Sequence, residues 1–254
     1  MFFSANRYPA RRNMRASAAA TKHCILSGAP RNRMPYALVI FDLDGTLVDS
    51  FSWFLSVANV VAREYGFRQI GDDDIEPLRR AGSREILRRL DVPLWQLPAI
   101  ARRMRALKRE QLDAISLFPG APTMLRTLRD AGLTLTLVSS DSEDNARRQL
   151  GESAALFSHV ACGASIFGKA AKFKTIMRRA GVTSAQVIAI GDEVRDIEAA
   201  RAAGIACGAA TWGYSATDAL VAMKPDLLFG KMNDITAQLT AQTTTLPSLR
   251  DPSD

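Results

Sequence analysis

The fold follows from one stretch of the chain, Ala37-Leu38-Val39-Ile40-Phe41-Asp42-Leu43-Asp44-Gly45-Thr46. Its first five residues form an unbroken apolar run, which is typical of a strand buried on both faces of a parallel sheet. Two carboxylates follow at the point where that strand ends, and Gly45 permits a turn that the hydroxyl of Thr46 can hold. On this pattern alone, an Asp-rich turn that merely closes a strand and a phosphoryl-transfer site are equally good interpretations.

Three more polar clusters stand beside strand-like runs or a helix start. Residues 133–138 lead into Ser139-Ser140-Asp141, and residues 187–190 lead into Gly191-Asp192-Glu193-Val194-Arg195-Asp196. Between them, Phe167-Gly168-Lys169 stands just ahead of an amphipathic helix. Ligands of open α/β sheets bind beyond the carboxyl ends of the strands. We therefore expect carboxylates, a hydroxyl and one lysine to share a single crevice.

The order and chemistry of these motifs resemble the haloacid dehalogenase superfamily of aspartate-nucleophile phosphatases, over roughly residues 36–235. The resemblance implies an α/β fold, a Rossmann-like parallel-sheet core with an inserted all-helical cap, and a phosphoglycolate-phosphatase-like branch. It implies that Asp42 is the nucleophile, that Asp44 is a general acid and then a base, and that Ser139 and Lys169 complete the catalytic set. A second Asp at position 44 is unusual among dehalogenases, which argues against that activity.

The implied cofactor is Mg²⁺, a hard cation that prefers carboxylate, phosphate and water oxygens. By resemblance its ligands are Asp42, Asp192, the backbone carbonyl of Asp44, and Asp196 directly or through water. Glu193 could also enter the metal shell, and that alternative stays open.

Substrate-binding candidates lie in the turns and in the cap. They are Thr46, Ser140, Arg80 and Arg84. Ser140 could instead cap a helix, and the two arginines could either grip an anion near Gly82 or simply face solvent. Lys172 and Lys174 compete with Lys169 for the lysine role, although a solvated helix face explains both of them.

The chain divides into a leader, a core in two pieces, a cap and a tail. The boundaries are 1–34 for a disordered basic leader, 35–49 and 118–236 for the core, 50–117 for the cap and 237–254 for a polar tail. Seven basic and no acidic residues precede Asp42, so the remaining 26 basic residues balance 26 acidic ones. The leader is either a transit peptide or an over-extended gene start, and Met34, just ahead of the first strand, favours the second.

Local periodicity predicts the elements. Helices are expected at 51–65, 75–90, 94–115, 123–131, 142–150, 171–180 and 196–203, and strands at 133–138, 159–162, 187–190 and 205–209 besides the first. This alternation predicts parallel strands with right-handed crossovers.

Composition narrows the function. Three cysteines without a CxxC pair, and two histidines, make a zinc site improbable, and sparse cysteine favours a reducing, cytoplasmic compartment. We expect no membrane span and no nucleic-acid partner, because no apolar run approaches about 20 residues and the excess positive charge lies in the leader. The expected partner is a small phosphorylated metabolite, bound by a monomer or homodimer. A phosphomutase and a catalytically idle phospholigand-binding protein remain the alternatives.

Overall fold

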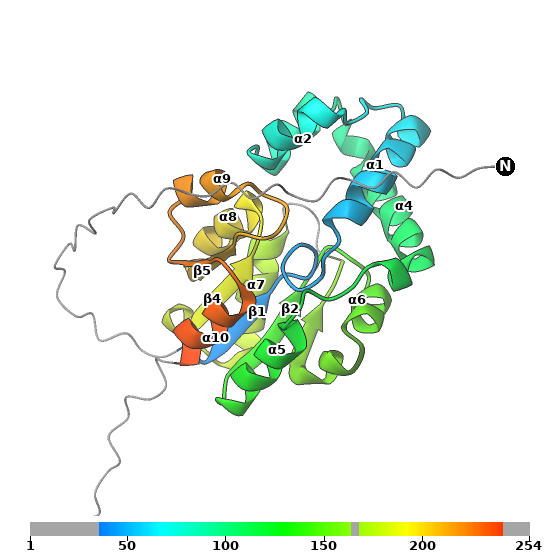
Figure 1. Cartoon of the computed structure of the whole chain (residues 1–254). Helices are drawn as coiled ribbons and strands as arrows, with labels where there is room; N and C mark the ends of the chain where they lie inside the picture. Colours follow the sequence, from blue (N-terminus) through cyan, green and yellow to red (C-terminus); the bar gives the residue numbers. More distant parts are fainter. Residues whose placement is uncertain (1–35, 164–167, 241–254) are drawn as a thin grey trace, which may run out of the picture. The chain divides into compact units, whose positions relative to one another are not determined.

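The computed structural model describes residues 36–163 and 168–240, and a parallel sheet of six strands runs through its centre (Figure 1). The strands are β1 (Leu38–Phe41), β2 (Thr134–Val138), β3 (Phe157–Ala161), β4 (Val187–Gly191), β5 (Ala206–Ala210) and β6 (Leu227–Phe229). Their order is β3-β2-β1-β4-β5-β6, and every pairing is parallel. The predicted Rossmann-like sheet is confirmed. Strand β6 is only three residues long, so its sequence is too short to show the periodicity that predicts a strand.

Alternation of side chains along each strand builds one helical layer on each face of the sheet. Val39 and Phe41 of β1 belong to the core cluster that includes α5 (Ala121–Asp130), α6 (Glu143–Leu150) and α10 (Met232–Thr240). Leu38 and Ile40 belong to the cluster that includes α7 (Lys169–Ala180), α8 (Val194–Ala203) and α9 (Thr217–Ala222). Because β1 is buried on both faces, its apolar run is uninterrupted, as expected for a central parallel strand.

Between β1 and α5 the chain folds into four helices joined by turns. These are α1 (Phe51–Tyr65), α2 (Asp72–Arg79), α3 (Ser83–Arg89) and α4 (Leu97–Glu110), with short 3₁₀ turns at Leu94–Gln96 and Leu112–Ala114. Val57, Val61 and Leu107 form a small core of their own. We refer to residues 50–117 as the cap segment, and its status as a separate domain stays a prediction.

The chain enters and leaves the cap segment along one narrow connection. Val48 forms an antiparallel bridge with Leu117. The Asp49 amide donates to the Ser116 carbonyl at 2.9 Å, and the Phe118 amide donates to the Leu47 carbonyl at 2.9 Å. This two-stranded connection lies directly after Asp44, so it ties the base of the cap segment to the predicted site.

Three expected boundaries differ by more than two residues from those observed. The helix expected at 75–90 is divided into α2 and α3, because Gly82 has extended backbone and begins a new helix. The helix expected at 94–115 is a 3₁₀ turn, α4 and a second 3₁₀ turn. The core does not end at 236, since α10 continues to Thr240 and buries Leu239 against the sheet. The whole of the expected leader and most of the expected tail lie outside the described residues.

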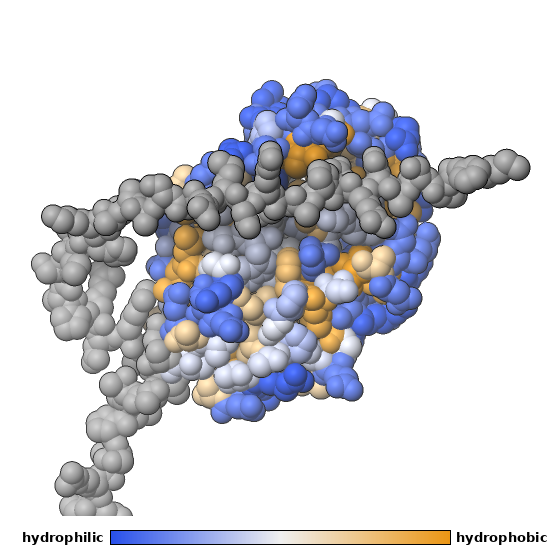
Figure 2. All heavy atoms as spheres, viewed as in Figure 1, coloured by the Kyte–Doolittle hydropathy of each residue, from blue (hydrophilic) through white to orange (hydrophobic). Residues whose placement is uncertain are grey.

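Within residues 36–163 and 168–240, no helix is both long and apolar enough to cross a membrane. On the face that Figure 2 presents, hydrophilic residues cover much of the surface around α2, and hydrophobic residues appear in separate patches. Leu94 and Trp95, both in the cap segment, are the most exposed large hydrophobic residues among those described.

Candidate active site

The four motifs meet at the carboxyl edge of the sheet. Asp42 follows β1, Ser139 follows β2 and Asp192 follows β4, while Lys169 and Asp196 lie in the first turns of α7 and α8. Since β1 pairs with both β2 and β4, the three strand ends are immediate neighbours. The topology thus brings together residues that are up to 154 positions apart in sequence, 42 to 196.

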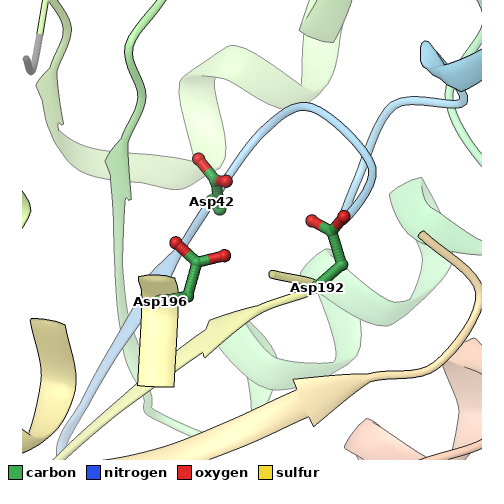
Figure 3. Close-up of side chains that lie close together, drawn as sticks. All are labelled: Asp42, Asp192 and Asp196. Atoms are coloured by element: carbon green, nitrogen blue, oxygen red, sulfur yellow. The ribbon is translucent and has the colours of Figure 1, made fainter. Parts of the chain in front are cut away.

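Three carboxylates form the centre of the site. One oxygen each of Asp42, Asp192 and Asp196 lies within 4.8 Å of the others, and Figure 3 shows the three side chains facing a common space. All three are buried. Burial raises the pKa of Asp42 to about 6, and burial together with the neighbouring carboxylates raises the pKa of Asp192 well above its usual range. Such a cluster is stable as anions only when a cation shares it.

Lys169 supplies part of that positive charge. Its Nζ lies 2.7 Å from Asp42 Oδ2 and 2.5 Å from Asp196 Oδ1, and its side chain is almost fully buried. Burial lowers the pKa of Lys169, but the two carboxylates outweigh it and the net shift is upward. For Asp196, burial opposes ionisation, yet Lys169 and Arg195 hold its pKa below the usual value. Lys169 is therefore a permanent cation between the expected nucleophile and Asp196.

The Asp192 carboxylate accepts hydrogen bonds from two segments, the turn after β1 and the loop after β5. Thr46 Oγ1 donates to Asp192 Oδ1 at 2.7 Å, and the Tyr214 amide donates to Asp192 Oδ2 at 2.7 Å. A Cβ at either Gly45 or Gly213 would overlap the Asp192 carboxylate. Gly45 also has φ +77°, so the turn after β1 requires glycine for its conformation as well as for space. Thr46, expected to touch substrate, is fully buried and holds a carboxylate instead.

Asp44 stands apart from the three carboxylates and meets the cap segment. Lys108 of α4 places its Nζ 2.5 Å from Asp44 Oδ1 and 2.7 Å from Asp141 Oδ2. Neither Lys108 nor Asp141 was among the predicted site residues. The sequence carries one signal that could have identified Lys108. This lysine follows Met104 by four residues, so it lies on the apolar face of α4 that packs against α1. A lysine on an apolar face needs a buried partner.

The loop after β2 presents Ser139. Its Oγ accepts from the Asp141 amide at 3.0 Å, so its own hydroxyl hydrogen is available to a ligand. Ser140 contributes its carbonyl, which accepts from Arg105 Nε of α4 at 2.8 Å. Helix α6 is capped by Ser142, two residues further on, and the capping alternative for Ser140 is wrong.

The two cap arginines chosen from the sequence are in exposed positions. Arg80 is about half exposed and pairs with Asp218 of α9 at 2.8 Å and with Glu76 at 2.9 Å, while Arg84 is also exposed. Arg79 is the arginine that joins α2 to the site, since it donates to the carbonyls of Tyr214 at 2.9 Å and Gly213 at 3.1 Å. The role of Arg80 and Arg84 in binding substrate stays a prediction.

The remaining candidates around the acidic centre have other partners. Glu193 caps α8 through its backbone, and its carboxylate pairs with Arg195. Lys172 donates to the Cys162 carbonyl, and Lys174 is exposed on α7. Among the three candidate lysines, Lys169 is the one that contacts Asp42.

Comparison with protein families identifies the family to which this chain belongs. Residues 39–210 match the family described as haloacid dehalogenase-like hydrolase, which covers more than half of the chain. This protein belongs to that family. It has the fold of a haloacid dehalogenase-like hydrolase.

Individual relatives agree with the family assignment. This hydrolase is 37% identical over 204 residues to a phosphoglycolate phosphatase of Synechococcus elongatus, an alignment that covers 80% of this chain and 96% of the relative. It is 34% identical to a phosphoglycolate phosphatase of Xanthomonas campestris, with 73% and 87% covered. The crystal structure of a putative phosphoglycolate phosphatase from Lactobacillus plantarum has the same fold, with a TM-score of 0.69, 22% identity, and 81% and 100% covered.

Proposed function

We propose that this hydrolase is a Mg²⁺-dependent phosphatase that removes the phosphoryl group from a small phosphate monoester through an aspartyl-phosphate intermediate. The observation that carries the proposal is the separation of two carboxylates by environment. Asp42 lies among Asp192, Asp196 and Lys169, while Asp44, two residues later, turns to Lys108. Similarity to the phosphoglycolate phosphatases supports the same substrate type.

In the first half of the reaction, an oxygen of Asp42 attacks phosphorus opposite the ester oxygen. The new Asp42–phosphorus bond forms as the phosphorus–ester bond breaks, and Asp44 gives its proton to the departing alkoxide. Lys169, 2.7 Å from Asp42, and the Ser139 hydroxyl would bind the phosphoryl oxygens. In the second half, Asp44 takes a proton from water, the water oxygen attacks phosphorus, and Asp42 departs as a carboxylate.

The residues fit a magnesium ion. Three buried carboxylates whose oxygens lie within 4.8 Å of one another offer the hard oxygen ligands that Mg²⁺ prefers. The raised pKa of Asp42 and Asp192 has its cause in burial and like charge, which a divalent cation would relieve. Asp42, Asp192 and Asp196 would hold the ion, with the Asp44 carbonyl as the fourth protein ligand expected from the resemblance. When bound, it would neutralise negative charge on the phosphoryl oxygens.

The test is phosphate release from p-nitrophenyl phosphate and from 2-phosphoglycolate, with Mg²⁺ and after treatment with EDTA. We expect turnover of both with Mg²⁺ and none in chelator, with recovery when Mg²⁺ is restored. Transfer of the phosphoryl group within a sugar phosphate, without phosphate release, would favour the phosphomutase alternative. Tight binding of phosphorylated ligands without any turnover would favour the idle binding protein.

A further inference from the structure

The cap segment contributes a buried, positively charged side chain, Lys108, to the site. Lys108 has a side-chain exposure of 4%, whereas Asp44, which it contacts, retains 24%. In the proposed reaction, the leaving group must reach Asp44 to receive its proton. A group attached to the leaving oxygen therefore comes close to the ammonium of Lys108.

The Lys108 ammonium has one more N–H group than its two carboxylate contacts require. A lysine carries three N–H groups, and Lys108 uses two of them on Asp44 and Asp141. Its other described neighbour is the Trp53 ring, whose centroid lies 6.0 Å from Nζ. The third N–H can meet an additional acceptor.

Asp141 has two donors besides Lys108, both on its other oxygen. Its Oδ1 accepts from the Ser142 amide at 2.7 Å and from Asn145 Nδ2 at 2.9 Å, besides its contact with Lys108. Asp141 and Asn145 are both buried, so they fix Lys108 from the core side. A buried ammonium held in this way pre-orients its free donor, which limits the entropy lost on binding an anion.

We infer that Lys108 determines substrate specificity by binding a carboxylate carried on the leaving half of the substrate. The inference rests on the proposed function. It assigns to this enzyme the class of small phosphorylated carboxylic acids, in which the carboxylate lies one carbon from the ester oxygen.

The experiment compares 2-phosphoglycolate with ethyl phosphate, which has a methyl group in place of the carboxylate. The variants are Lys108→Met, Lys108→Arg and the matched control Lys174→Met, whose lysine is exposed on α7. Purified variants are first compared with the wild type by circular dichroism and thermal unfolding. The quantity measured is kcat/KM for each substrate with Mg²⁺, expressed as the ratio of phosphoglycolate to ethyl phosphate.

We expect Lys108→Met to lower that ratio roughly 10- to 150-fold, the range expected for loss of one charge-assisted hydrogen bond. Lys108→Arg retains a cation and should restore most of the ratio, and Lys174→Met should leave it unchanged. Equal losses on both substrates would overturn the inference, because Lys108 would then act only by positioning Asp44. If the wild type hydrolyses neither substrate, it is the proposed function that fails.

Discussion

Asp42 and Asp44 are separated by a single leucine, yet the chain gives them different surroundings. Asp42 is buried beside Lys169 and two other carboxylates, whereas Asp44 is partly open and faces Lys108. Two carboxyl groups in unlike environments can take unlike roles, one as nucleophile and the other as proton carrier. The turn at Gly45, with φ +77°, is what directs the chain away after Asp44.

Replacement of Asp44 by Asn tests the proton-carrier role. The substitution preserves size but removes the group that protonates the leaving alkoxide, so kcat/KM, which reports the leaving-group step and not hydrolysis of the shared intermediate, should fall by about 10²–10⁴-fold on an alkyl phosphate. A substrate with a good leaving group, such as p-nitrophenyl phosphate, needs less protonation and should suffer less. Equal losses on both substrates would argue against a general acid at this position.

The same residues show what the sequence could predict. Asp42, Asp192 and Asp196 lie in short linear motifs at strand ends, and parallel topology then forces them together. Lys108 could not be found in this way, because its partners Asp44 and Asp141 lie on other elements and its own neighbours resemble any basic helix. Thr46 was placed in the correct turn, but whether its hydroxyl faces substrate or Asp192 depends on packing that no local pattern encodes.

At the scale of elements, the loop between β5 and α9 is the support of the site. Gly213 lies against Asp192, the Tyr214 amide donates to that carboxylate, and Arg79 of α2 donates to the carbonyls of both residues. The Tyr214 ring also packs against Phe51 of α1, with ring centroids 5.1 Å apart. One loop thus links the cap segment to an expected metal ligand.

Gly213→Ala tests this support. A Cβ at this position would overlap the Asp192 carboxylate, so the loop or the ligand must shift. A displacement of about 1 Å can cost on the order of 100-fold in rate, and we expect a loss of that size in kcat/KM with weaker Mg²⁺ activation. The control is Gly82→Ala, where the added Cβ would meet Val194 at an ordinary 3.9 Å. Comparable activity in the two variants would contradict the account.

Element boundaries followed from the sequence where caps and periodicity agreed, as in α1, whose bounds Phe51–Tyr65 match the expected ones. The predicted boundaries were wrong where tertiary contacts determine where an element begins or ends. The three residues of β6 gain strand structure by pairing with β5, and α10 extends past 236 because Leu239 is covered by the core. Such contacts join segments that are distant in sequence, so they leave no local signal.

At the scale of the whole molecule, the acidic centre should couple metal binding to stability. Burial raises the pKa of Asp42 to about 6 from an ordinary value of 3.8. Without metal, the folded state therefore binds a proton that the unfolded chain has lost, and the contribution of Asp42 to stability decreases as pH rises from about 4 to about 6. Mg²⁺ requires the ionised carboxylates and competes with these protons.

The expected outcome is a rise in the unfolding temperature on addition of Mg²⁺ that is larger at about pH 7.5 than at about pH 5. Differential scanning calorimetry of the whole chain in EDTA and in excess Mg²⁺ measures it without reference to turnover. Asp192→Asn, which removes one proposed ligand, should lose most of the response. A Mg²⁺ effect that is the same at both pH values, or that persists in this variant, would place the metal elsewhere.

The most direct test of the central claim is to trap the intermediate. Wild-type enzyme mixed with a ³²P-labelled phosphate monoester and Mg²⁺ is quenched in acid within the first turnover, and the protein is analysed for bound label. We predict an acid-stable, hydroxylamine-labile phosphoryl group that peptide mapping places on Asp42, and its absence from a folded Asp42→Asn variant that no longer turns over. Substrate turnover with no trapped label, or label on the Asp42→Asn protein, would contradict the assignment of Asp42 as the nucleophile.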